Sequence, residues 1–133
     1  MPVLIRLFGF FASSLPAHLV TGATGENRAA RYLRRHGMRI LGRNVHVGKK
    51  DEIDIVAYDP IDKVVVFAEV KTRAHHNDDY AADLNITPDK KGNMTRAARR
   101  WIREHDFHGG YRMDVLLVED GRVTDHYEEI AWD

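Results

Sequence analysis

Two acidic residues and a lysine are the first candidates for chemistry in this 133-residue chain. Asp54 lies in a stretch that alternates apolar and charged residues, which is typical of a strand. Glu69 and Lys71 lie two residues apart near the end of the next apolar stretch, so both side chains project from the same face of a strand. Carboxylates that are brought together repel unless a proton or a cation lies between them, and oxygen ligands suit hard cations such as Mg²⁺. These residues therefore predict a divalent-cation site.

The turn between the two strands decides whether the two acids meet. The intervening sequence Asp-Pro-Ile-Asp is a turn signal. If residues 60–63 form a four-residue loop, Asp59 faces Val64 and, counting outward, Asp54 faces Glu69. Directly opposed residues have Cβ atoms about 4.5–5.5 Å apart. Because a slip of one residue would turn one acid to the other face, the predicted site depends on this register.

The alternative is a solvated ion pair between Glu69 and Lys71 on an exposed sheet face, which would contribute little. The third strand is otherwise nearly all apolar, which is typical of burial on both faces. A further acid, Glu26, falls on the same side of a predicted helix as Ala29 and Leu33, where an acid needs a partner. Three acids and a lysine therefore converge, and this favours the cation site.

The elements that would position these residues follow the order of an α/β domain. The first helix is predicted to begin at the N-cap Thr24 and to end at Gly37, and the second to begin at Thr87. Residues 1–20 are predicted to be an apolar segment ahead of a single domain at 21–133, with neither a secretion signal nor an integral membrane segment. The predicted strands are 38–47, 52–58, 63–72, 111–119 and 122–126, with a polar loop at 73–87.

Composition excludes several classes of site. The chain has no cysteine, which excludes disulfides, thiolate metal sites and a cysteine nucleophile. Its 20 basic and 20 acidic residues give zero net charge, whereas nucleic-acid binders usually carry a basic surplus. The sum hides a division, because residues 28–103 carry +7 and residues 104–133 carry −7.

The basic residues gather on the two predicted helices, and no acid lies between residues 90 and 103. The alternative is two solvated helix faces. Phosphate contacts need such clusters, and the acids that would neutralise them locally are missing. We therefore predict a nucleic-acid-binding surface formed by Arg28, Arg31, Arg35, Arg73, Lys91, Arg96, Arg99 and Arg100.

Asp54, followed after fourteen residues by Glu69-Val70-Lys71, resembles the PD-(D/E)XK nuclease signature. The wider pattern resembles the YraN-type family of predicted endonucleases, which are related to Holliday-junction resolvases. The resemblance spans about residues 22–130, and Asp51 departs from it because the family usually has glycine there. The matching segments, in the family's order, are Gly25-Glu26, Ile40-Leu41, Arg43-Asn44, Glu52-Ile53-Asp54, residues 67–73, Lys90 eleven residues before Trp101, and Met113-Asp114-Val115.

The resemblance implies a three-layer, restriction-endonuclease-like core, with a mixed β-sheet flanked by helices. It implies Asp54 and Glu69 as ligands of Mg²⁺ or Mn²⁺, Glu26 near the metal, Lys71 as the catalytic lysine and Lys90 near the scissile phosphate. The implied function is that of a cytoplasmic, metal-dependent endonuclease acting on DNA, including branched or junction structures. DNA is expected ahead of RNA, and a homodimer would suit a substrate of two strands.

Two other classes of function stay open. One is a nucleic-acid-binding module that keeps the nuclease fold with weak catalysis, although such a module has no need of opposed carboxylates. The other is a structural or assembly protein that uses the apolar residues 1–20. Outside the acid cluster, the sequence predicts that Asp114 buttresses a basic residue and that His126 takes part in no triad-like arrangement. The pair His75 and His76 is interpreted as part of a solvated loop.

Overall fold

A computed structural model describes residues 17–73 and 87–129 of the chain. The predicted strands are confirmed to within about a residue, whereas the first helix begins earlier than predicted and the second ends at Glu104, ahead of the break predicted at residues 108–110. Neither helix is both long and apolar enough to cross a membrane. Most of the predicted loop at 73–87, with its histidines, and residues 1–16 lie outside the described part. The elements are α1 (Ala17–Arg35), β1 (Arg39–Val47), β2 (Asp51–Asp59), β3 (Val64–Arg73), α3 (Pro88–Glu104), β4 (Gly110–Glu119) and β5 (Arg122–Tyr127).

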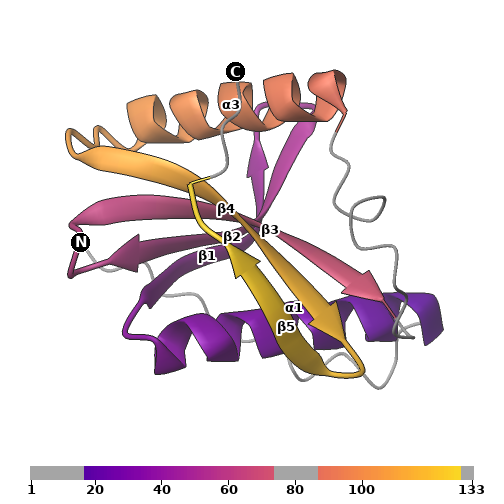
Figure 1. Ribbon diagram of the computed structural model, residues 1–133. Helices are drawn as coiled ribbons and strands as arrows, with labels where there is room; N and C mark the ends of the chain where they lie inside the picture. Colours follow the sequence, from indigo (N-terminus) through magenta and orange to yellow (C-terminus); the bar gives the residue numbers. More distant parts are fainter. Residues whose placement is uncertain (1–16, 74–86, 130–133) are drawn as a thin grey trace.

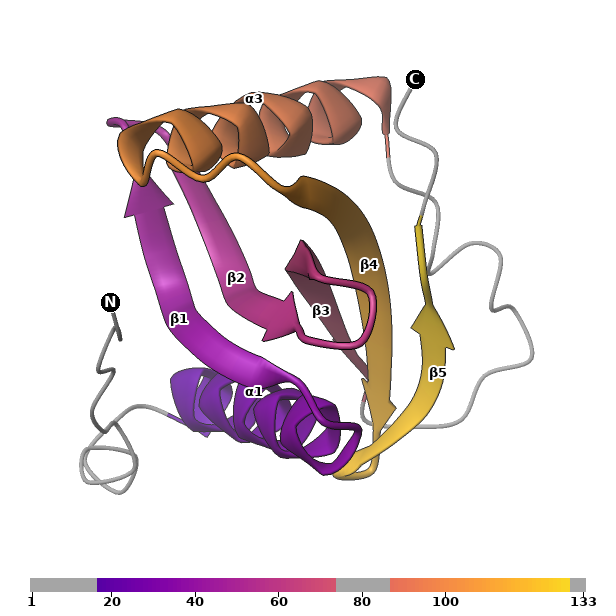
Figure 2. The same cartoon turned by 90° about the vertical axis from the view of Figure 1, so that its left-hand side faces the viewer.

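The five strands form one mixed sheet in the order β1-β2-β3-β4-β5. Neighbouring strands are antiparallel except β3 and β4, which run parallel over the whole length of β3. A parallel pair needs a crossover connection, and α3 lies within it. The two helices lie on opposite sides of the sheet (Figure 1, Figure 2). The predicted α/β class, a mixed sheet flanked by helices, is confirmed.

Two apolar cores lie on the two faces of the sheet. Under α1, Leu33 packs against a group that includes Val66 and Leu116. Under α3, Trp101 packs against a group that includes Phe67, and their ring centroids are 5.6 Å apart. The prediction that Trp101 belongs to the core is confirmed. Even-numbered residues of β3 thus face α1 and odd-numbered residues face α3, which puts Glu69 and Lys71 on the α3 side.

The helix α1 begins at Ala17, so the prediction that Thr24 caps its N-terminus is wrong. Thr24 and Gly25 lie inside the helix, and Gly25 is buried. A Cβ atom at position 25 would lie 2.3 Å from Oγ1 of Thr72 on β3. Glycine inside a helix costs about 1 kcal/mol relative to alanine. The glycine is therefore explained by the close approach of α1 to β3 and not by a helix start.

The alternation predicted for β2 fails near its first residues. The alternation predicts that Ile53, Ile55 and Ala57 share one face. Ile55 and Ala57 do pack together under α1, but Ile53 packs with Val56 on the α3 side. Pairing between β2 and β3 ends at Ile55 and Ala68, although both strands continue past that point. Because twisted strands rotate relative to one another, β2 leaves β3 here and stays paired with β1 alone. The candidate acids lie at this divergence.

Candidate functional site

The β2–β3 hairpin has the register that the sequence predicts. Asp59 pairs with Val64, and at the next step beyond the end of the ladder Asp54 comes level with Glu69. There the Asp54 carboxylate takes the place of a main-chain acceptor, because its Oδ2 accepts a hydrogen bond from the backbone N–H of Val70 at 2.8 Å. This bond holds the Asp54 side chain against β3 where the strands part.

Glu69 is only 8% exposed, and the charges of two lysines act on it. Nζ of Lys90, in the first turn of α3, lies 3.6 Å from Glu69 Oε2. The predicted cap of this helix is confirmed, because Oγ1 of Thr87 accepts the backbone N–H of Lys90 at 3.2 Å. The charge of Lys71 is close enough to oppose the rise in the pKa of both Asp54 and Glu69. The structure thus brings the two acids and two lysines together.

Glu26 reaches the same cluster from α1. Its carboxylate is hydrogen-bonded to the Asn44 side chain, and the charges of Arg43 and Asp54 both act on it. The β1–β2 register sets Asn44 level with Asp54. Asn44 has a φ of 48°, a left-handed conformation that asparagine adopts more readily than most residues. The tight contact at Gly25 brings this turn of α1 onto β3. The partners of Glu26 were missed by sequence reasoning, although Arg43-Asn44 is one of the matching family segments.

Burial raises the pKa of all three acids. For Glu69 the charge of Asp54 raises the pKa further, and Lys90 and Lys71 offset only part of the rise. The pKa of Asp54 is raised mainly by burial, against the hydrogen bond from Val70 and the charges of both lysines. For Glu26 the charge of Asp54 is the second cause after burial. Carboxylates that repel one another in this way favour an added proton or a cation.

The donor set fits a hard divalent cation held mainly by two carboxylates. Mg²⁺ is usually bound through one or two carboxylates, with waters and substrate phosphate oxygens completing its coordination. Asp54 and Glu69 supply that pair. Across residues 17–73 and 87–129, no group of three or more His, Asp or Glu side chains is arranged to hold a metal ion. A ligand role for Glu26 therefore stays a prediction.

The predicted basic residues do not form one continuous surface. Among the described residues, arginines line a hollow of about 330 Å³ beside α1 and another of about 420 Å³ on α3. The first is lined by Arg28, Arg31 and Arg35, together with Arg122. The second is lined by Gly92, Thr95, Arg96, Arg99 and Arg103. Lys91 is half-buried in the first turn of α3.

Two of the predicted basic residues on α3 have acidic partners. Arg96 donates from Nε and Nη2 to the carboxylate of Asp51 at 3.0 and 2.8 Å. Arg100 donates from Nε to Glu104 at 3.1 Å. The expectation that α3 lacks neutralising acids is wrong for these two arginines, because one acid comes from β2 and the other from the end of the helix. Asp51, the departure from the family pattern, is the residue that holds Arg96.

Arg73 lies apart from the two hollows. It is the last residue of β3 and pairs in register with Glu119, the last residue of β4. The two side chains form an ion pair and are only 11% and 5% exposed. This partner makes Arg73 the weakest member of the predicted phosphate-binding set.

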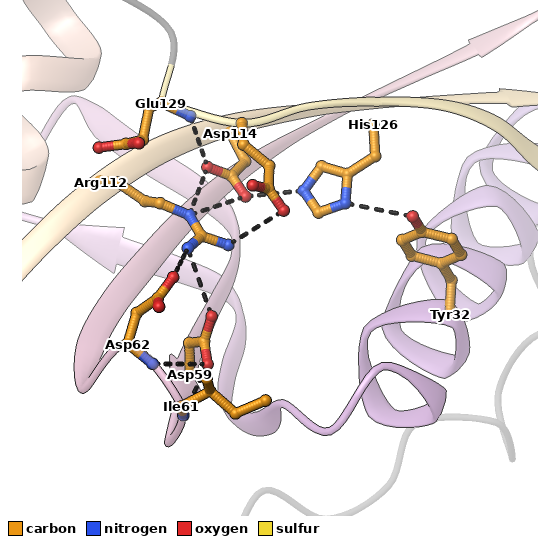
Figure 3. A network of polar contacts seen from close by, with 9 residues as sticks. Tyr32, Asp59, Ile61, Asp62, Arg112, Asp114, His126 and Glu129 are labelled. Carbon is orange, nitrogen blue, oxygen red and sulfur yellow. Dashed lines mark hydrogen bonds and ion pairs between the residues drawn. The ribbon is translucent and has the colours of Figure 1, made fainter.

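A polar network on the α1 side of the sheet was not predicted (Figure 3). Asp114 is fully buried and accepts from Arg112 Nε at 3.1 Å, which confirms its predicted buttressing role. His126 Nε2 lies 2.7 Å from the other Asp114 oxygen, and His126 Nδ1 lies 3.2 Å from the Tyr32 hydroxyl. Because the carboxylate accepts, Nε2 carries a proton, and in the neutral ring Nδ1 accepts from Tyr32. The expectation that His126 has no triad-like arrangement is therefore wrong.

The same network secures the β2–β3 turn. Arg112 Nη1 donates to Asp59 Oδ2 at 3.3 Å and to Asp62 Oδ2 at 3.1 Å (Figure 3). Asp59 Oδ1 accepts the backbone N–H of Ile61 at 2.9 Å, which closes the turn. The alternation of Arg112 and Asp114 along one strand was the one signal in the sequence. The network, which we call the Arg112 network, thus supports the register on which the acid pair depends.

A family model for "Uncharacterised protein family UPF0102" matches residues 25–118. A UPF0102 protein of Oleidesulfovibrio alaskensis is 43% identical over 108 residues, which are 80% of this chain but only 52% of that relative, so this chain spans about half of its length. A UPF0102 protein of Streptomyces coelicolor is 41% identical over 116 residues, covering 83% of this chain and 87% of the relative. One from Pelobacter propionicus is 38% identical over 114 residues, covering 83% and 79%. The chain therefore belongs to the uncharacterised protein family UPF0102, the YraN-type family that its motifs resemble.

Proposed function

We propose that this protein is a metal-dependent endonuclease that hydrolyses phosphodiester bonds in DNA at the acid pair Asp54 and Glu69. The observation that carries the proposal is the state of these two carboxyls, which lie level on diverging strands and both have a raised pKa. Buried charges that serve stability are normally matched by donors or by opposite charge. Here burial leaves negative charge that a cation would balance. The PD-(D/E)XK-like signature supports the same function.

Asp54 and Glu69 would hold Mg²⁺ or Mn²⁺. A divalent cation bound there supplies a water of lowered pKa and neutralises charge that develops on the phosphate. Val70 fixes one oxygen of Asp54, which leaves the other free to face a ligand. Glu26, tied to Asn44, adds negative charge from the α1 side and is the third candidate ligand.

The two lysines act on the substrate side of the proposed site. The charge of Lys71 acts on both carboxylates, and we assign this lysine a positioning and electrostatic role and not that of a general base. Lys90 pairs with Glu69 without substrate, and it is placed to exchange that contact for a phosphate oxygen. The basic hollows on α1 and α3 would contact the DNA backbone away from the scissile bond.

Branched or junction DNA is the substrate structure that we infer from the family resemblance, with a homodimer to act on two strands and a cytoplasmic location. A nucleic-acid-binding module with weak catalysis is the second candidate. The observation that favours the module is that the described residues bring no group of three metal-ligating side chains together. The two candidates differ in what they predict for cleavage, because only the enzyme requires Glu69.

The test is a cleavage panel of branched, linear duplex and single-stranded DNA, with matching RNA, in Mn²⁺ and in EDTA. The wild type is compared with Glu69→Gln, and Asp106→Asn serves as a control that removes one exposed carboxylate elsewhere. We expect Mn²⁺-dependent cleavage that falls by about 100-fold or more in Glu69→Gln and is unchanged in the control. Equal cleavage by wild type and Glu69→Gln would overturn the proposal, and binding without cleavage would establish the module instead.

A further inference from the structure

The hollow beside α1 forms a second site, on the opposite side of the helix from the acid pair. We call it the arginine pocket. Its volume of about 330 Å³ lies within the range of roughly 300–1,000 Å³ that small-molecule pockets occupy. It is formed where the outer side of α1 meets the β4–β5 turn. Its lining residues are Arg28, Arg31, Tyr32, Arg35, His36, Gly121, Arg122 and Val123.

The pocket concentrates positive charge that the described residues do not neutralise. Four of its lining residues are arginines and none is acidic. The arginine ion pairs found in residues 17–73 and 87–129 involve Arg73, Arg96, Arg100 and Arg112, and none of these lines the pocket. Guanidinium groups gathered around one hollow repel one another, and an anion bound between them removes that repulsion.

The helix geometry separates this pocket from the acid pair. Arg28, Arg31 and Arg35 follow one another at the spacing that places side chains on one side of a helix. Arg28 follows Glu26 by two residues, so its side chain leaves α1 about 200° around the axis from Glu26. Since Glu26 faces the acid pair, the arginine pocket lies on the other side of α1.

One wall of the pocket is aromatic and held from behind. The Tyr32 and His36 rings are in contact, with centroids 4.1 Å apart and planes tilted by 35°, and His36 Nδ1 lies 2.8 Å from the Tyr32 carbonyl oxygen. The Tyr32 hydroxyl is bonded to His126, which is bonded in turn to the buried Asp114. A wall fixed in this way loses little freedom when a ligand binds. Aromatic faces are also the surfaces on which nucleobases stack.

We propose that the arginine pocket binds the phosphate of a nucleotide unit, either within a single strand or as a free nucleotide. Arginine forks bind phosphate oxygens in pairs, which suits the four guanidinium groups. The wall of Tyr32 and His36 offers the attached base a stacking surface. This inference deepens the proposed function, which assigns this hollow to contacts with the DNA backbone. The pocket requires no divalent cation, so binding there can be tested separately from cleavage at the acid pair.

The test measures binding in EDTA, where the acid pair is metal-free. A fluorescein-labelled oligothymidylate is titrated with wild type and followed by anisotropy, and ATP and inorganic pyrophosphate are added as competitors. The pocket variant is Arg31→Gln with Arg122→Gln. The control is Arg34→Gln with Arg39→Gln, which removes two exposed arginine charges outside the pocket. We expect about tenfold or greater weakening in the pocket variant, because it loses the charge-assisted hydrogen bonds of two of the four guanidinium groups, and little change in the control.

The competitors identify the source of the phosphate. Displacement of the oligonucleotide by ATP at similar concentration shows a free-nucleotide site, and retention against ATP shows a strand site; both support the pocket. Backbone amide signals of Gly121 and Val123 should shift on titration in a folded sample. Equal weakening in the pocket and control variants, or no binding of any probe by wild type, would overturn the proposal. Cleavage by the pocket variant on saturating DNA would leave the proposed function intact, so the two proposals can fail separately.

Discussion

Two groups of carboxylates lie in different parts of the same sheet, one on the side of α1 and one where β2 diverges from β3. In the Arg112 network, Asp114 accepts hydrogen bonds from Arg112, from His126 and from the backbone N–H of Glu129. In the acid pair, Asp54 accepts one hydrogen bond from within the described residues, and Nζ of Lys90 lies 3.6 Å from Oε2 of Glu69. Asp114 and Glu69 are both buried, but only the Arg112 network has enough donors for its carboxylates.

The pKa directions express the same difference. Burial alone would lower the pKa of Arg112, but the hydrogen bond and charge of Asp114 outweigh it and raise the pKa, so the network keeps its charges. In the acid pair, burial outweighs the hydrogen bond from Val70 and the charges of the two lysines, and the pKa of Asp54 and of Glu69 rises. The network therefore stabilises the fold and the β2–β3 turn. The acid pair lowers the stability of the metal-free protein, because its negative charge is not balanced. Such unbalanced charge is expected of a site that binds a cation.

The largest expected effect is on the network. Asp114→Asn removes the carboxylate that Arg112 and His126 share and leaves a buried guanidinium without its main partner. We expect a loss of about 3–5 kcal/mol in the free energy of unfolding, measured by urea denaturation. Asp62→Asn removes an exposed partner of the same arginine and should cost less than about 1 kcal/mol. Equal losses in the two variants would mean that Asp114 is not the centre of the network.

The next effect concerns the contact that carries Glu26 to the acid pair. Gly25→Ala gains about 1 kcal/mol of helix propensity but sets a methyl group 2.3 Å from the present position of Thr72 Oγ1. Overpacking costs about 1–3 kcal/mol, and a contact this short belongs to the upper half of that range, so we expect a net loss of about 1–2 kcal/mol in the free energy of unfolding, measured by urea denaturation. Thr72→Ala in the same chain should restore stability. A Gly25→Ala protein as stable as wild type would show that α1 does not need the glycine.

The smallest effect is a gain. Because the pKa of Asp54 is raised on folding, the folded protein holds more protons than the unfolded chain between the ordinary and the raised value. The stability of the metal-free protein therefore falls as pH rises through that range. Asp54→Asn keeps an acceptor for Val70 and should be more stable than wild type by about 1 kcal/mol at neutral pH.

That gain should close as pH falls below about 4, the ordinary pKa of an aspartate carboxyl, because Asp54 is then protonated in both the folded and the unfolded state. Thermal unfolding in EDTA over this pH range measures it. Asp106→Asn, which removes an exposed carboxylate, should show no such pH-dependent gap. A stability gap between Asp54→Asn and wild type that widens on acidification would contradict the claim that folding raises the pKa of Asp54.

The parts of the fold that depend on local sequence could be predicted. The Asp-Pro-Ile-Asp turn and period-two alternation set the register of Asp59 with Val64, and this brought Asp54 level with Glu69 without reference to any distant residue. Thr87 before Pro88 predicted the helix start that carries Lys90. Turns and helix caps are determined by residues that are adjacent in the sequence, so a short segment is enough to predict them.

The parts of the structure that depend on partners far apart in the sequence could not be predicted. Gly25 resembles a helix start until Thr72 of β3 is placed against it. His126 joins Asp114 because an irregularity between Leu117 and Val118 shifts the β4–β5 register. Without that shift, counting back from the two-residue turn would put His126 on the other face, so strand periodicity alone leads away from the network.

The most direct measurement of the central claim is a calorimetric titration of the metal-free protein with Mn²⁺. Wild type is compared with two double variants. The first combines Asp54→Asn with Glu69→Gln, and the second combines Asp62→Asn with Glu128→Gln, which removes two carboxylates around Arg112 instead. The account predicts one saturable site in wild type that survives in the second variant and is lost in the first. Equal binding by all three proteins, or no saturable site in wild type, would contradict it.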